Sequence, residues 1–133
     1  MDQYELYFDG CSLGNPGLSG SGCVIYKNGE EIWAESYFVG DKSTNNEAEY
    51  MGLIHGLLGA INLGIKTLII RGDSQLILNQ MMGIYQVRSI SLLLKYDQAK
   101  NLEQQFEEIT YEHVLRHLNK RADKLSKIGA TRG

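Results

Sequence analysis

Residues 44–50 have the sequence TNNEAEY and predict the start of a long helix, around which the rest of the chain is organised. Thr44 and Glu47 have the spacing of a capping box, in which both side chains accept hydrogen bonds from backbone N–H groups at the helix start. The helical pattern runs to about Leu63, where a glycine follows and ends it. Glu47 is therefore assigned to the helix end, which leaves Glu49 free for another role.

Glu49 projects about 200° farther round the helix than Glu47. It lies in line with a row of small residues, Gly52, Gly56 and Ala60, which would let the helix approach a sheet closely. The helix dipole favours a negative charge at this end. Glu49 is thus a candidate for a shared site at the top of a closely packed seam, although first-turn acids commonly do no more than complement the dipole.

The segment before the helix predicts an antiparallel meander of three strands. Residues 4–9 alternate between two faces, and we expect Asp9 to end this first strand. A loop rich in turn-forming residues follows. The second strand is expected at about 21–27 and the third at about 30–39, joined by the two-residue turn Asn28-Gly29. A plain hairpin turn is the alternative role for Asp9 and the glycine after it.

After the helix, residues 67–70 form a short, continuously apolar run that predicts a strand buried on both faces and paired in parallel. Asp73 follows this strand. Ligand sites in open α/β sheets lie outside the carboxyl ends of strands, so Asp73 is well placed for function. A simple N-cap aspartate is the alternative.

The remaining sequence predicts a short helix at 75–82, a longer helix through about Phe106, a strand at 110–114 and a terminal helix from about Asn119. Asn119 can cap that helix, and Asp123 lies one turn on. The whole pattern predicts an α/β fold with a mixed five-stranded sheet, three antiparallel strands followed by parallel strands, and helices on both faces.

Composition is that of an ordinary globular domain. The 133 residues are 43% hydrophobic and 22% charged, which fits one domain with a real core and excludes a disordered chain. There is no pattern of a signal peptide or a transmembrane segment. We therefore expect a cytoplasmic protein without a membrane partner. Cys11 and Cys23 are too few for a disulfide framework.

Charge is distributed unevenly along the chain. The net charge of −3 argues mildly against a nucleic-acid partner. Residues 113–133, however, carry six Lys or Arg residues against a single acid, Asp123, and form a basic C-terminal segment. The alternative is a solvated helix surface without a partner.

Four acids occupy a strand end, a helix start, a second strand end and a late helix: Asp9, Glu49, Asp73 and Asp123. Carboxylates that converge on one point repel one another unless cations compensate their charge. Hard oxygen ligands without cysteines indicate Mg²⁺ or Mn²⁺ and not zinc. The sequence therefore predicts a metal site built from these four acids.

Four collinear motifs resemble the type 1 ribonuclease H family over nearly the whole chain. In order they are Phe8-Asp9-Gly10 with Gly14-Asn15-Pro16-Gly17, Thr44-Asn45-Asn46-Glu47-Ala48-Glu49, Gly72-Asp73-Ser74-Gln75, and His113-Val114-x-Arg116-x-x-Asn119-x-x-Ala122-Asp123. The chain is similar to the compact form of the family, with no basic protrusion between the central helices and no separate hybrid-binding domain expected before Asp9. The resemblance implies a ribonuclease H-like fold and one catalytic domain, residues 1–133.

The family resemblance implies an endonuclease that hydrolyses the RNA strand of RNA–DNA hybrids with two metal ions, Mg²⁺ or Mn²⁺. The products would carry 5′-phosphate and 3′-hydroxyl ends. The metal ligands and catalytic acids would be Asp9, Glu49, Asp73 and Asp123. His113 matches the family histidine that assists proton transfer and product release, while Arg116 and His117 are close enough in sequence to compete for that role.

Substrate contacts also follow from the resemblance. The minor groove and the 2′-hydroxyls of the RNA would be contacted by Asn15, Asn45, Asn46 and Gln75. Further contacts to the nucleic-acid backbone would come from Cys11, Ser12 and Ser74. The implied partner is an RNA–DNA hybrid, bound weakly and with strong salt dependence. No protein partner is implied, and we expect a monomer.

Three other functions remain open at this stage. A DNA nuclease, resolvase or integrase-like enzyme on the same fold would share the acids but lack the Asn and Gln set suited to a 2′-hydroxyl. A binding module that has lost its chemistry is disfavoured by the presence of all four acids. The chain could also be part of a larger polyprotein such as a reverse transcriptase, although its start and finish suggest a free-standing enzyme.

Overall fold

The computed structural model describes residues 1–132 and contains a five-stranded mixed sheet of order β3-β2-β1-β4-β5. The first three strands pair antiparallel, and β4 and β5 continue the sheet in parallel with β1. This arrangement confirms the predicted sheet. The strands are β1 (Tyr4–Leu13), β2 (Gly17–Lys27), β3 (Glu30–Ser43), β4 (Thr67–Gly72) and β5 (Glu108–His113).

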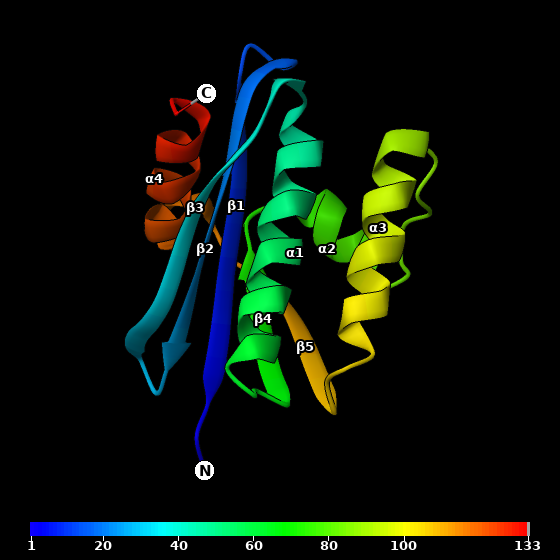
Figure 1. The fold of residues 1–133 in the computed structure, drawn as a ribbon. Coiled ribbons are helices and arrows are strands. Elements are labelled where there is room, and N and C mark those ends of the chain that lie inside the picture. The colour runs from blue at the N-terminus through cyan, green and yellow to red at the C-terminus, as the bar shows by residue number, and fades with distance from the viewer. Residues whose placement is uncertain (133) are drawn as a thin grey trace.

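Helices cover both faces of the sheet, as predicted (Figure 1). One face is covered by α4, which lies so close to β2 that a side chain at Gly22 would meet the α4 backbone. The other face is covered by α1, with α3 farther out beyond it. The helices are α1 (Asn45–Asn62), α2 (Gln75–Met81), α3 (Ile90–Glu103) and α4 (Lys120–Ala130), with a 3-10 turn at Arg116–Leu118.

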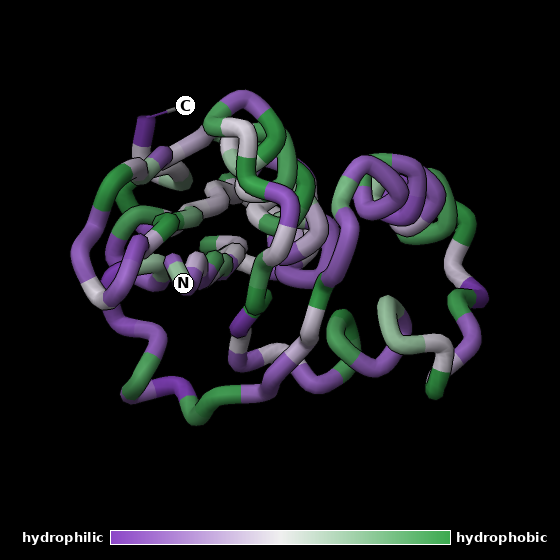
Figure 2. Tube along the Cα trace, turned by 90° about the horizontal axis from the view of Figure 1, so that it is seen from below, coloured by the Kyte–Doolittle hydropathy of each residue, from purple (hydrophilic) through white to green (hydrophobic). Residues whose placement is uncertain are grey.

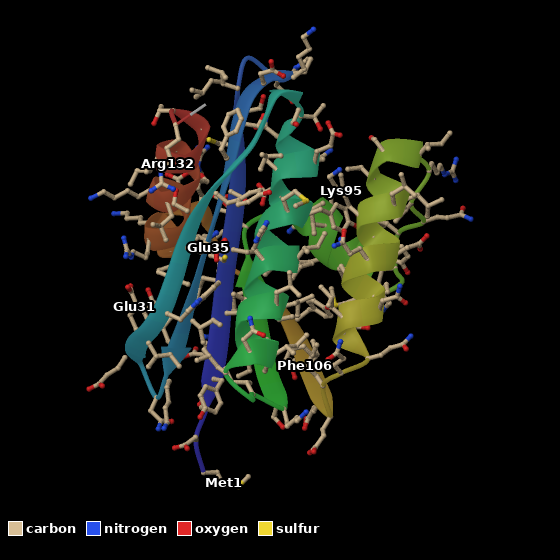
Figure 3. All side chains as sticks on the ribbon, in the orientation of Figure 1. Met1, Glu31, Glu35, Lys95, Phe106 and Arg132 are labelled. Carbon is tan, nitrogen blue, oxygen red and sulfur yellow. The ribbon has the colours of Figure 1, made fainter. Side chains whose placement is uncertain are left out.

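The start of α1 has the predicted capping box. The Thr44 hydroxyl accepts a hydrogen bond from the Glu47 backbone N–H at 3.2 Å, and the Glu47 carboxylate accepts one from the Thr44 N–H at 2.9 Å. Lys95 of α3, labelled in Figure 3, approaches the same Glu47 carboxylate at 4.0 Å. Glu47 is therefore occupied in holding the helix end.

Small residues bring α1 close to β1. A Cβ atom built at Gly52 would lie 2.6 Å from the Asp9 carbonyl oxygen, and one at Gly56 would meet the side chain of Leu6. The predicted seam is therefore confirmed. Such contact leaves no space for a larger side chain, so the helix is held at a fixed height over the strand.

The prediction that Asp9 ends the first strand is wrong. β1 continues to Leu13, and Asp9 pairs with Gly22 of β2 in the middle of the strand. The glycine after Asp9 suggested a turn, but a side chain at Gly10 would collide with the backbone of α1 at Ala48 and Glu49. Gly10 therefore serves helix packing and not a turn.

Other boundaries moved by a few residues. β3 extends to Ser43 and not 39, α3 ends at Glu103 and not near Phe106, and β5 spans Glu108–His113 instead of 110–114.

The core lies between the sheet and α1, and its largest fully buried side chains include Phe8, Tyr50 and Ile70. In Figure 2 hydrophilic segments interrupt the hydrophobic ones along the helices, and within residues 1–132 no helix is long and apolar enough to cross a membrane.

Candidate active site

Three of the predicted acids meet at one point above the sheet. Asp9 comes from β1, Glu49 from the first turns of α1, and Asp73 follows β4 directly. One carboxylate oxygen from each lies within 4.8 Å of the others. The meeting follows from the fold, because β1 and β4 are neighbours in the sheet and the α1 seam fixes Glu49 over β1.

These acids are held where negative charge is unfavourable. Asp9 is 4% exposed, and burial followed by the charge of Asp73 raises its pKa to about 7. Burial, followed by the charge of Asp9, also raises the pKa of Glu49 well above its usual value. Within residues 1–132, the buried Oε2 atom of Glu49 has no hydrogen-bond partner. An unpaired oxygen beside two other carboxylates fits a divalent cation, because hard oxygen ligands suit Mg²⁺ and Mn²⁺.

The raised pKa of Asp9 predicts how stability depends on pH without metal. The folded state keeps a proton on Asp9 up to a pKa of about 7, whereas the unfolded chain releases it near 3.8. The free energy of unfolding should therefore fall between pH 4 and 7, by about 3–4 kcal/mol. Urea unfolding in EDTA across this range measures the fall, and added Mn²⁺ should reduce it. Stability that rises with pH in EDTA would contradict the assigned surroundings of Asp9.

Asp123 of α4 borders the group of three without joining it as closely. Its Oδ2 atom lies 2.9 Å from the Nζ atom of Lys127, one turn along the helix. Burial opposes the shift, but hydrogen bonds with Lys127 and Asp9 outweigh it and hold the pKa of Asp123 below its usual value. Asp123 is therefore ionised and already paired with a cationic side chain. The Lys127 contact was not predicted, although its i,i+4 spacing from Asp123 is a recognisable signal.

A cleft of about 300 Å³ contains all four acids. Its lining comes from β1, α1 and α4 and from the segments that follow β4 and β5. The residues that line it are Asp9, Gly10, Cys11, Asn45, Glu49, Asp73, Ser74, Arg116 and Asp123.

The three candidates for proton transfer lie in different places. The Nε2 atom of His113, at the end of β5, is 3.3 Å from the carbonyl oxygen of Asp73. Arg116 lines the cleft itself. His117 instead lines a separate cavity of about 430 Å³ together with Tyr7 and Tyr26. The geometry therefore favours His113 and Arg116 over His117.

A polar bracket joins the β1–β2 turn to the start of α1. The Asn45 Oδ1 atom accepts a hydrogen bond from the Ser12 backbone N–H at 2.7 Å, and the Asn15 Oδ1 atom accepts one from the Asn45 N–H at 3.0 Å. These bonds fix both amide oxygens on the protein. The amide oxygens are thus used within the protein, and the amide nitrogens are the remaining donors of these two side chains.

Of the remaining predicted contact residues, Cys11 and Ser74 line the same cleft, and Gln75 and Asn46 lie next to residues that line it in the chain. The Ser74 hydroxyl caps α2 by accepting from the Ile77 N–H at 3.3 Å, so Asp73 is not the cap. Gln75 is exposed at the first position of α2, and Asn46 is half-buried at the start of α1. Cys11 is a partly buried thiol in the cleft, and burial raises its pKa.

Asn119 does not cap α4 as predicted. Its side chain makes no capping hydrogen bond. The Nδ2 atom instead donates to the Phe8 carbonyl oxygen at 2.9 Å and approaches Asp73 Oδ1 at 3.5 Å. The sequence indicated a polar residue before a helix but contained no signal for these contacts, which depend on the distant strands β1 and β4.

Known relatives share most of this chain. A family described as reverse transcriptase-like matches residues 7–129. The bifunctional protein Rv2228c of Mycobacterium tuberculosis is 43% identical over 119 residues, which cover 89% of this chain and 33% of that protein. Ribonuclease HI of Halobacterium salinarum is 38% identical over 122 residues, which cover 92% of this chain and 61% of that protein. The chain thus spans a third of the mycobacterial relative and less than two thirds of the halobacterial one.

Solved structures agree with these relatives. The N-terminal RNase H domain of Rv2228c has a TM-score of 0.94 at 37% identity, covering 98% of this chain and 95% of that one. LC11-RNase H1, isolated from compost and solved in complex with an RNA/DNA hybrid, has a TM-score of 0.91 at 30% identity over 98% of both chains. On the family match, the shared fold and the acids that meet above the sheet, this chain belongs to the type 1 ribonuclease H family.

Proposed function

We propose that this chain is an endoribonuclease that hydrolyses the RNA strand of RNA–DNA hybrids with two divalent cations, Mg²⁺ or Mn²⁺. The observation that carries the proposal is the meeting of Asp9, Glu49 and Asp73, whose oxygens lie within 4.8 Å of one another. The hybrid bound to the related LC11-RNase H1 supports the choice of substrate. The products would carry 5′-phosphate and 3′-hydroxyl ends.

The cations would be held by Asp9, Glu49 and Asp73, with Asp123 at the α4 side of the cleft. When bound, cations of this kind supply an activated water for in-line attack and stabilise the leaving 3′ oxygen. The protein's part is to hold the carboxylates in fixed positions, so that a bound cation would supply the positive charge that their burial lacks. Their rigid support from β1, β4 and the α1 seam suits that role.

Proton transfer would be assisted by His113 or Arg116. His113 is exposed at the end of β5 beside the Asp73 carbonyl, and Arg116 lines the cleft. An imidazole titrates near neutral pH and a guanidinium does not. If His113 serves, His113→Ala should flatten the pH profile of kcat, whereas Arg116→Ala should lower kcat at every pH. An unchanged shape of the pH profile in His113→Ala, together with a loss of kcat in Arg116→Ala, would assign the role to Arg116.

RNA would be distinguished from DNA by amide donors that reach its 2′-hydroxyls. The bracket of Ser12, Asn15 and Asn45 uses both amide oxygens, and Asn45 lines the cleft, so the amide nitrogens of the two asparagines would be the donors. A 2′-hydroxyl can accept from such donors, and DNA lacks this group. Asn46, Gln75, Cys11 and Ser74 would add contacts around the same edge, and selection would depend on sugar and shape with little dependence on base sequence.

Binding should be weak and should weaken further with salt, because the few cationic side chains that are free would carry the contacts to phosphates. Arg121 is paired with both carboxylate oxygens of Glu31, and Lys127 is paired with Asp123, which leaves Lys120 and Lys124 exposed on α4. Each phosphate contact adds about −0.7 to −0.9 to the slope of log affinity against log salt. With contacts from these two lysines we expect a slope of roughly −1.5 by fluorescence anisotropy.

Substitution tests the origin of this salt dependence. Lys124→Ala should weaken hybrid binding and reduce the slope by about one contact. Lys66→Ala, an exposed lysine before β4 and outside α4, is the matched control and should change neither quantity. If affinity barely changed between low and moderate salt, the basic segment would have no part in binding.

The proposed activity is tested with a hybrid whose RNA and DNA strands carry different labels, beside the corresponding DNA duplex. In Mg²⁺ or Mn²⁺ the RNA strand alone should be cut, and the duplex should stay intact. Cleavage of duplex DNA would favour a DNA nuclease on the same fold. Hybrid binding without any cleavage would indicate a binding module.

A further inference from the structure

Asn119 stands immediately before α4 but differs from the caps of the other helices. It is 1% exposed, and its backbone has φ −118° and ψ 30°. Thr44 and Ser74, which cap α1 and α2 with their side chains, both have extended backbones, with ψ of 166° and 102°. Because an N-cap side chain needs the extended conformation to reach the helix amides, Asn119 is turned toward the sheet instead.

Its contacts join the chain segments that carry three of the acids. The Nδ2 atom donates to the carbonyl oxygen of Phe8, the residue before Asp9, at 2.9 Å. The same atom lies 3.5 Å from Asp73 Oδ1, the outer limit for such a contact. The Asn119 carbonyl oxygen accepts from the Asp123 N–H at 3.0 Å. One buried residue therefore ties together the backbone beside Asp9, the Asp73 carboxylate and the turn that carries Asp123.

The chemistry of these contacts suits a metal site better than a packing role. An amide N–H is a neutral donor, so it orients the Asp73 carboxylate without cancelling its charge. Lys127, by contrast, brings a full positive charge to Asp123. Donors of this kind behind metal ligands fix their orientation and tune their affinity for the ion.

Packing alone does not account for the residue. Within residues 1–132, the buried Oδ1 atom of Asn119 has no hydrogen-bond partner. A buried acceptor without a donor lowers stability, and such local costs are typical of functional sites. The Asn119 side chain thus keeps its Oδ1 atom buried without a partner, while its Nδ2 atom contacts the Phe8 carbonyl oxygen and the Asp73 carboxylate.

We propose that Asn119 is a positioning residue that sets the geometry of the cation site by holding the Asp73 carboxylate against the backbone beside Asp9. This inference rests on the proposed function and deepens it, because it adds a supporting residue to the ligands. It acts through Asp73 and makes no contact with substrate.

The test compares Asn119→Ala and Asn119→Ser with Gln80→Leu. Gln80 is the matched control, a second buried amide that is 4% exposed and accepts from the Tyr50 hydroxyl at 2.6 Å, outside the cleft. Calorimetric titration with Mn²⁺, thermal unfolding and steady-state kinetics on a hybrid are measured for each protein. Loss of a donor behind a metal ligand typically costs about 10–100-fold in affinity or activity.

Asn119→Ala should weaken Mn²⁺ affinity and lower kcat within that range, and it should leave KM for the hybrid nearly unchanged. Asn119→Ser should lose less, because its hydroxyl can still donate. Gln80→Leu should unfold at a lower temperature and keep wild-type Mn²⁺ affinity. If Asn119→Ala does not fold, Asn119→Leu gives the same comparison, since it keeps a similar volume without a donor.

Two outcomes would overturn the inference. One is wild-type Mn²⁺ affinity in a folded Asn119→Ala or Asn119→Leu protein. The other is a loss of Mn²⁺ affinity in Gln80→Leu as large as that in the Asn119 variants. The loss in the Asn119 variants would then be explained by general destabilisation of the fold. If the wild-type protein itself neither bound Mn²⁺ nor cut the hybrid, the proposed function would fail as well. If the wild-type protein does bind Mn²⁺ and cut the hybrid, either of the two outcomes above overturns the positioning role of Asn119 and leaves the proposed function standing.

Discussion

Asp9→Asn should abolish cleavage of the RNA strand and at the same time stabilise the protein without metal. Asp9 is 4% exposed beside Glu49 and Asp73, so its carboxylate is the centre of the acid group. An amide has nearly the same shape but supplies no negative charge to a cation. We expect kcat to fall on the order of 10³-fold, because the transition state loses several kcal/mol of charge stabilisation when the ion loses a ligand.

The stability change has the opposite sign, and this makes the prediction specific. Burial and the charge of Asp73 raise the pKa of Asp9 to about 7, so ionising it in the folded state is unfavourable. The amide removes that cost, and the variant should unfold at a higher temperature than wild type in EDTA at pH 8. Asp97→Asn, an exposed position on α3, is the control and should change neither property. An active Asp9→Asn protein would remove the basis for the site.

Glu49→Gln and Glu47→Gln should give opposite results, although the two acids are only two residues apart. Glu49→Gln should lose activity on the order of 10³-fold, because the Glu49 carboxylate shares the metal group with Asp9. Glu47→Gln should keep most activity, because glutamine also serves at this position of a capping box. Both variants are assayed on the same labelled hybrid in Mg²⁺.

The stability of this pair supplies the internal control. Glu47 closes the helix end through its bond from the Thr44 N–H at 2.9 Å, so Glu47→Ala should lower the free energy of unfolding by about 0.5–1 kcal/mol while cleavage persists. Were Glu47→Gln the inactive protein and Glu49→Gln the active one, the roles assigned to the two carboxylates would be reversed.

Local rules predicted the parts of the site that depend on one segment. The capping spacing and the row of small residues separated Glu49 from Glu47, and both features are present in α1. The parallel strand before Asp73 followed from its apolar run and its crossover. Each of these signals lies within a few residues of the feature that it predicts, so the prediction did not require knowledge of contacts with distant segments.

Features that depend on distant segments could not be predicted in the same way. Asp9 stands in mid-strand because β1 continues to pair with β2 beyond it, and Gly10 leaves space for the α1 backbone, neither of which the Asp-Gly pair reveals. Asn119 turns from its helix to Phe8, which is 111 residues earlier in the chain. Arg121 belongs to the basic C-terminal segment, residues 113–133, but its side chain pairs with Glu31 of β3. In each case the partner comes from another element, so the sequence around the residue carries no sign of it.

The dependence of RNA cleavage on divalent cation tests the central claim most directly. The rate of cutting of a labelled hybrid is measured in EDTA and across a Mg²⁺ and a Mn²⁺ titration, for wild type and for Asp9→Asn. The three acids, whose oxygens lie within 4.8 Å of one another, predict no cutting in EDTA, a rise to saturation with either ion, and no rise for Asp9→Asn. Cleavage that persists in EDTA, or a hybrid that binds tightly yet stays intact at saturating Mn²⁺, would contradict the claim that these carboxylates form a catalytic metal site.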